Sequence, residues 1–147
     1  MIRFLRQLLR RFVGSASKPS LPSSVQSDEL LGRFLFSREH FAETKGLVKP
    51  KGFLPDKDGE TSVFRITDLA DDAIWTIGNA IRPEKAKARG DVITNIVRRA
   101  NLRVEPATQD HPRHAVIVGW PEPKHEKLML ATLLSKDATL HIQKDFS

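Results

Sequence analysis

The sequence contains no cysteine. This absence excludes disulfides, thiolate nucleophiles, cysteine-rich zinc sites and iron-sulfur clusters held by cysteine. The sequence also has no apolar run near the roughly 18 residues that a membrane-spanning helix needs. Arginines interrupt the apolar residues near the N-terminus, which is unlike the continuous core of a secretory signal. These absences lead us to expect a soluble, cytoplasmic protein.

Common signatures of enzymes are missing as well. The sequence has no phosphate-binding Walker loop, no dinucleotide-binding glycine pattern, no HExxH motif and no nucleophile elbow. His111 and His114 flank a proline three residues apart, but without a third ligand they do not predict a metal site. We therefore expect no metal and no cofactor, and the balance of these features favours a protein that is not an enzyme.

The excess of positive charge is confined to one end of the chain. The net charge is +6 and the isoelectric point is near 9.9. Residues 1–27 hold five cations and no acid, whereas residues 28–147 hold 19 cations and 18 acids. Because binding to nucleic acid requires clustered cations, the nearly neutral body does not favour a nucleic-acid partner, although a local basic patch stays open.

Residues 1–14 have the pattern of a basic amphipathic helix, with arginines on one face and leucines and phenylalanines on the other. Residues 15–27 are rich in serine and proline, which predicts an extended linker. We expect the helix to contact a membrane or a partner protein through nine residues: Arg3, Phe4, Leu5, Arg6, Leu8, Leu9, Arg10, Arg11 and Phe12.

Three interpretations of this segment stay open. It could lie on an anionic membrane surface, with apolar side chains buried and arginines at the headgroups. It could be a cleavable mitochondrial presequence, which would place the protein in the mitochondrial matrix. It could also pack on its own domain or on a partner protein. A helix of this length is marginal in water and needs a surface on which to form.

Residues 28–147 are expected to form one α+β domain, with a mixed or mainly antiparallel sheet of four to five strands and three helices. A hairpin is predicted around the Asp58-Gly59 turn, since the turn separates two β-prone segments. Periodicity predicts helices over residues 68–82, 91–100 and 124–136, the last of them well buried, and strands over 102–105, 115–120 and 138–142.

Four residues are candidates for chemistry. His114 stands just before the apolar strand, where loop-to-strand junctions often present functional groups. Arg113 precedes it, and His40 and Arg65 could join it in a cleft for an acidic or phosphorylated ligand. The simpler interpretation of His114 is a histidine that fixes its turn through hydrogen bonds to the backbone.

Three segments resemble those of small uncharacterised bacterial proteins with no established activity. They are Val48-Lys49-Pro50 with Gly52-Phe53-Leu54-Pro55, residues Asp58 to Arg65, and Pro112-Arg113-His114-Ala115-Val116-Ile117-Val118-Gly119-Trp120-Pro121. The resemblance covers residues 35–140 and implies a single domain. It also implies a bacterial source, which makes the mitochondrial presequence less attractive.

Two functional hypotheses follow from the sequence. The first is a non-enzymatic binding or adaptor protein that its N-terminal helix recruits to a membrane surface or a protein partner. The alternative is a small enzyme that acts on a nucleic-acid or nucleotide substrate, as a nuclease or in ADP-ribosyl transfer, through His114 and nearby arginines.

Overall fold

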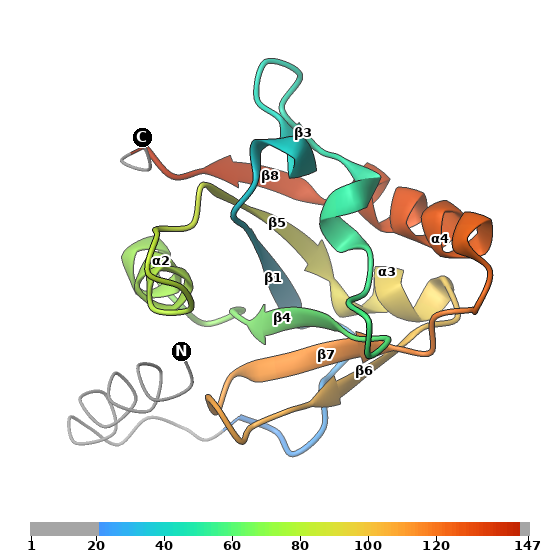
Figure 1. The fold of residues 1–147 in the computed structure, drawn as a ribbon. Helices are drawn as coiled ribbons and strands as arrows, with labels where there is room; N and C mark the ends of the chain where they lie inside the picture. Colours follow the sequence, from blue (N-terminus) through green and yellow to red (C-terminus); the bar gives the residue numbers. More distant parts are fainter. Residues whose placement is uncertain (1–20, 145–147) are drawn as a thin grey trace.

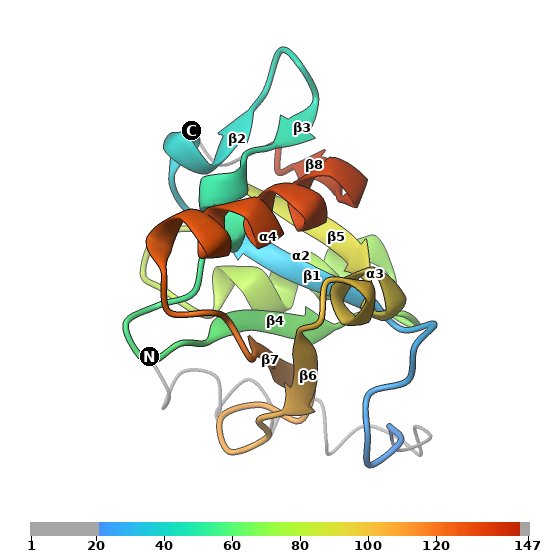
Figure 2. The ribbon, with the colours of Figure 1, turned by 90° about the vertical axis from the view of Figure 1, so that its right-hand side faces the viewer.

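A computed structural model describes residues 21–144 of the chain. They form a six-stranded antiparallel sheet between two layers of helices (Figures 1 and 2). The strands lie in the order β6-β7-β4-β1-β5-β8. Their bounds are β1 Leu30–Leu35, β4 Thr61–Arg65, β5 Ala88–Ile93, β6 Arg103–Pro106, β7 His114–Val118 and β8 Thr139–Ile142. A second small sheet joins β2 (Phe41–Ala42) to β3 (Leu47–Val48).

One face of the sheet carries the larger core. It is covered by α3 (Thr94–Arg99), α4 (Lys124–Asp137) and the 3-10 helix η2 (Pro50–Phe53), and Figure 2 shows α4 in front of the strands. Phe53 and Leu134 are fully buried there against the strands. Apolar side chains buried between helices and sheet are the main source of stability in such a layer.

The opposite face is covered by α2 (Asp71–Asn79), which buries Ile74 and Ile77 against Phe34 and Phe64 of the sheet. The rings of Phe34 and Phe64 meet edge to face with their centroids 5.7 Å apart. A side chain at Gly78 would place its Cβ only 2.4 Å from the Phe34 ring. Glycine at this position therefore allows α2 to approach the sheet closely.

The α+β class with three α-helices is confirmed in the described residues, but the sheet is larger than predicted. Residues 91–93 were expected to begin a helix and instead end β5, where Asp91, Val92 and Ile93 pair with β1. Pairing with β1, and at Asp91 with β8 as well, outweighs the helical periodicity here. The segment before the predicted Asp58-Gly59 turn was expected to be the first strand of a hairpin, but Gly52 and Phe53 lie in η2 instead.

Helix α4 occupies the predicted range, yet it is less buried than its composition indicates. Ala131 and Leu134 are fully buried, whereas Leu128, Met129 and Leu133 are about half exposed or more. The apolar residues of α4 are spread around its circumference, but only one side of the helix can face the sheet. The expectation of a well-buried helix is therefore wrong.

The last residues of the predicted linker contact the domain. Val25 is a member of the larger core, and its carbonyl oxygen accepts a hydrogen bond of 2.5 Å from Arg98 Nη2. Arg98 Nη1 also donates to Ser27 Oγ. Arg98 thus ties residues 25–27 to α3. The helix predicted over residues 1–14 lies outside the described residues. None of the helices in residues 21–144 has the length and apolar character to span a bilayer.

Candidate functional site

The pairing between β1 and β4 is short, and Arg33 of β1 follows directly after it. Their pairing runs through Leu31↔Arg65 and Gly32↔Phe64. At the next position of β1, Arg33 Nε donates to the carbonyl oxygen of Gly52 at 2.8 Å, and its Nη1 donates to the carbonyl oxygen of Ser62 at 3.0 Å. The guanidinium of Arg33 therefore links β1, β4 and η2 through backbone oxygens.

A small open pocket of about 170 Å³ lies beside Arg33, between the sheet and the chain that leaves α2. Its walls combine three phenylalanines and an isoleucine with five polar side chains. The lining residues are Arg33, Phe34, Phe36, Ser37, His40, Ser62, Phe64, Ile81 and Arg82. Two arginines and a histidine thus face the same small space, and no carboxylate lines it.

The electrostatics of the pocket reflect this concentration of positive charge. Burial and the neighbouring charge of Arg82 lower the pKa of Arg33 to about 10. Burial also lowers the pKa of His40, and the charges of Arg33, Lys51 and Arg82 add to the effect. The neutral form of His40 is therefore favoured in this pocket.

Arg82 stands at the rim of the pocket. Its guanidinium carbon lies 4.4 Å from the centre of the Phe36 ring, so that the aromatic face holds the side chain in place. Glu84 lies 4.0 Å from Arg82 Nη1, but both side chains are about half exposed. An ion pair at this distance and exposure is weak, so Arg82 keeps most of its capacity to bind an anion.

His114 lies next to the pocket on β7. Its Nε2 is 2.6 Å from Ser62 Oγ, and its Nδ1 is 3.0 Å from the carbonyl oxygen of Ala107. Its ring also contacts Phe64, with the two centres 5.1 Å apart. Of the four predicted residues, His40 lines the pocket, and His114 touches it through Ser62.

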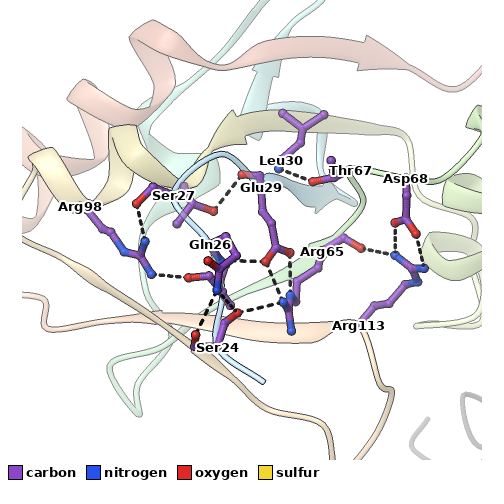
Figure 3. Close-up of polar contacts among 12 residues, drawn as sticks. Ser24, Gln26, Ser27, Glu29, Leu30, Arg65, Thr67, Asp68, Arg98 and Arg113 are labelled. Carbon is purple, nitrogen blue, oxygen red and sulfur yellow. Dashed lines mark hydrogen bonds and ion pairs between the residues drawn. The ribbon is translucent and has the colours of Figure 1, made fainter. Parts of the chain in front are cut away.

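Arg65 instead serves the structure. It forms a buried two-bond ion pair with Glu29, in which Nε donates to Oε1 at 2.8 Å and Nη2 donates to Oε2 at 2.7 Å (Figure 3). Arg65 Nη2 also donates to the carbonyl oxygen of Ser24. Burial pushes the pKa of Glu29 upwards, but the hydrogen bonds from Arg65 and from the Gln26 N–H hold it below its usual value. The pair fixes the start of the domain to β4.

Arg113 is likewise engaged in the structure. Its guanidinium donates to both carboxylate oxygens of Asp68, at 2.7 and 3.2 Å, and to the carbonyl oxygen of Arg65 at 3.0 Å (Figure 3). The Arg113 N–H donates to His111 Nδ1, which fixes the turn before β7. Arg65 and Arg113 are thus each bonded to a carboxylate, and neither lines the pocket that contains His40. The chemical role expected for them beside His114 and His40 stays a prediction.

His111 is buried beside Phe64. Burial lowers its pKa to about 4, and the nearby charge of Arg113 contributes. Within residues 21–144, no group of three or more histidine, aspartate or glutamate side chains is arranged to hold a metal ion.

A third charged cluster lies between β5 and α2. Arg89 donates to Asp91 on its own strand and to Asp71 of α2, and it stacks on the ring of Trp75. Burial raises the pKa of Asp91 despite the charges of Arg89 and His141. Arg89 has two carboxylate partners, so this cluster resembles the Arg65 pair rather than the pocket.

Sequence reasoning missed Arg33, Ser62 and Arg82. The one signal in the sequence is that Arg33 interrupts an apolar run. That signal does not show which strand would lie beside Arg33. The nine residues expected to bind a membrane or a partner, from Arg3 to Phe12, lie outside the described residues, and their role stays a prediction.

In comparisons with known proteins, no family model, curated protein or solved structure matches this chain.

Proposed function

We propose that the protein binds the phosphate group of a small ligand in the pocket between Arg33 and Arg82. The observation that carries this proposal is the absence of any carboxylate among the lining residues, which do include two arginines and a histidine. Guanidinium groups bind phosphate through paired, charge-assisted hydrogen bonds. Arg33 uses Nε and Nη1 on backbone carbonyls, which leaves Nη2 without a hydrogen-bond partner among residues 21–144.

The size of the pocket favours one chemical group over a whole nucleotide. Sites that enclose drug-sized ligands measure roughly 300–1,000 Å³, whereas this pocket measures about 170 Å³. A phosphate group would fill its polar part, and the rest of the ligand would extend outwards past Phe36 and Ile81. The apolar wall suits an uncharged group next to the phosphate.

His40 makes the proposed site sensitive to pH. Burial and the charges of Arg33, Lys51 and Arg82 lower its pKa, and the neighbouring carboxylate of Glu39 offsets only part of this effect. A bound dianion would offset that repulsion, so anion binding should raise the pKa of His40 and take up protons. Binding of sulfate, which does not itself titrate near neutral pH, should accordingly strengthen as the pH falls.

This proposal retains part of the enzyme hypothesis and replaces its arginines. His40 and the neighbourhood of His114 remain, but Arg33 and Arg82 take the place of Arg65 and Arg113. The adaptor hypothesis rests on residues 1–14, and the pocket is compatible with it: a chain recruited to a surface could also bind a phosphorylated ligand there.

Calorimetric titration of the full chain with inorganic phosphate tests the proposal. We expect saturable binding that Arg82→Gln weakens about tenfold, the value of one charge-assisted hydrogen bond of about 1.4 kcal/mol. Arg99→Gln is the matched control, because Arg99 is an exposed arginine on α3 outside the pocket. Equal weakening by both substitutions would indicate general electrostatic attraction and contradict the proposal.

A further inference from the structure

The hydrogen bond between Ser62 and His114 has a defined direction. The carbonyl oxygen of Ala107 can only accept, so the His114 Nδ1 that faces it must carry the hydrogen. In the neutral ring this leaves a lone pair on Nε2, 2.6 Å from Ser62 Oγ. Ser62 therefore donates its hydroxyl hydrogen to His114. A serine whose proton points at a histidine, with the histidine oriented by a third group, is the arrangement that activates a hydroxyl as a nucleophile.

The backbone holds this pair rigidly. Ser62 lies within β4, between Thr61 and Val63, both of which are buried on the opposite face. Thr61 Oγ1 donates to the carbonyl oxygen of Phe53, and Arg33 Nη1 donates to the carbonyl oxygen of Ser62. His114 is on the neighbouring strand, where it pairs with Phe64. A site built on paired strands keeps its geometry better than one built on loops.

Ser62 also lines the pocket that contains Arg33, His40 and Arg82. A phosphate group held there would lie beside the Ser62 hydroxyl, with arginines available to balance the charge on its oxygens. Phosphoryl transfer depends mainly on such positioning and charge stabilisation. Ser62 therefore lies next to a general base, His114, and also lines a cationic pocket.

We propose that Ser62 is a nucleophile and His114 its general base, and that the pair transfers the phosphoryl group of a phosphate monoester. This inference rests on the proposed phosphate binding. Ser62 Oγ attacks phosphorus as its proton passes to His114 Nε2, the bond from phosphorus to the ester oxygen breaks, and the departing alcohol takes the proton from His114. Water then gives a proton to His114 and attacks the phosphoserine. The phosphorus–Oγ bond breaks, Ser62 regains its proton, and inorganic phosphate leaves.

The first arm of the test uses diisopropyl fluorophosphate, which forms a stable bond to an activated serine and releases fluoride. Incubation of the full chain followed by peptide mass spectrometry should locate the label on Ser62. Ser37 is an internal control, since it lines the same pocket while its hydroxyl oxygen accepts from the Glu39 N–H. Ser62→Ala should abolish the label, and His114→Gln should slow labelling about 100-fold or more.

Labelling of the unmodified chain keeps the test valid if His114→Gln does not fold. Inorganic phosphate, which competes for the same pocket, should protect Ser62 from the reagent. Absence of label on Ser62 in a protein that binds phosphate would overturn the nucleophile and leave the binding proposal intact. Labelling that phosphate does not slow would overturn the link between the pair and the pocket.

The second arm addresses the substrate class. The chain is incubated with 4-nitrophenyl phosphate and quenched in acid, in which phosphoserine is stable. We expect release of 4-nitrophenol and phosphoserine at position 62, both of which Ser62→Ala removes. Labelling by the fluorophosphate without any phosphoserine or 4-nitrophenol would overturn the phosphate-ester step.

Discussion

Arg65 and Arg33 lie on neighbouring strands of one sheet and have opposite environments. Arg65 is buried and makes two short hydrogen bonds to the carboxylate of Glu29. Arg33 is half-buried and bonds to the carbonyl oxygens of Gly52 and Ser62, with Arg82 as a second cation nearby. Glu29 neutralises the charge of Arg65 through direct contact, whereas no carboxylate is bonded to Arg33 and the charge of Asp56 acts on it only from a distance.

This difference separates structural charges from available ones. A carboxylate partner satisfies both the hydrogen bonds and the charge of an arginine, but a carbonyl partner satisfies the hydrogen bonds alone. Excess charge at Arg33 and Arg82 raises the free energy of the empty pocket and favours an incoming anion. The comparison therefore explains why the pocket, and not the Arg65 network, is the candidate site.

The largest expected effect comes from breaking the buried pair. Arg65→Met leaves the carboxylate of Glu29 buried without its partner, which typically costs about 3–5 kcal/mol of unfolding free energy. Urea denaturation monitored by circular dichroism would measure the loss. A loss below about 1 kcal/mol would show that Glu29 reaches water readily and that the pair is not a structural requirement.

A pH scan tests His111, the buried histidine in the turn before β7. The pKa of His111 is lowered to about 4 in the folded protein, against about 6.5 when unfolded. The unfolded state therefore binds the proton first, so this contribution is complete above pH 6.5 and is lost as the pH falls towards 4. The linkage predicts a loss of about 3 kcal/mol over that window.

His111→Asn isolates that contribution, because an asparagine can still accept from the Arg113 N–H and does not titrate. Urea unfolding at pH 7 and pH 4.5 should show a smaller difference for the variant than for the original chain. His40 contributes in the same direction in both proteins, so the two slopes can be compared directly. Identical slopes would contradict the assignment to His111.

The smallest stability effect is expected on the pocket side. Arg33→Met loses two hydrogen bonds to backbone oxygens and also removes a charge that has no carboxylate partner. These changes oppose each other, and we expect a net loss of about 1 kcal/mol, well below that of Arg65→Met. Phosphate affinity should nevertheless fall at least about tenfold. A stability loss equal to that of Arg65→Met would erase the distinction between the two arginines.

Several elements of the fold could be predicted from local sequence. The apolar run of β7 and the periodicity of α4 led to correct positions, and Gly59, with a φ of 78°, provides the turn predicted at Asp58-Gly59. Residues 91–93 show the limit of this reasoning, because a helical pattern gave way to strand pairing with β1. Local patterns do not encode which strands become neighbours.

The candidate site depends on those neighbours. His40 and His114 could be singled out by their chemistry, but the role of Arg65 changed once Glu29 was brought against it from 36 residues away. Arg33 and Ser62 meet because β1 pairs with β4, and Arg82 joins them because α2 crosses that face. Only the three-dimensional arrangement distinguishes the arginine with a carboxylate from the one without.

The most direct test of the central claim follows arginine side-chain signals by nuclear magnetic resonance during titration of the full chain with sulfate. The Nε–H signal of Arg33 should shift and saturate, while the corresponding signals of Arg65 and Arg89 should stay unchanged because carboxylates already bind them. A signal of Arg33 that does not respond, or an equal response from Arg65, would contradict the account.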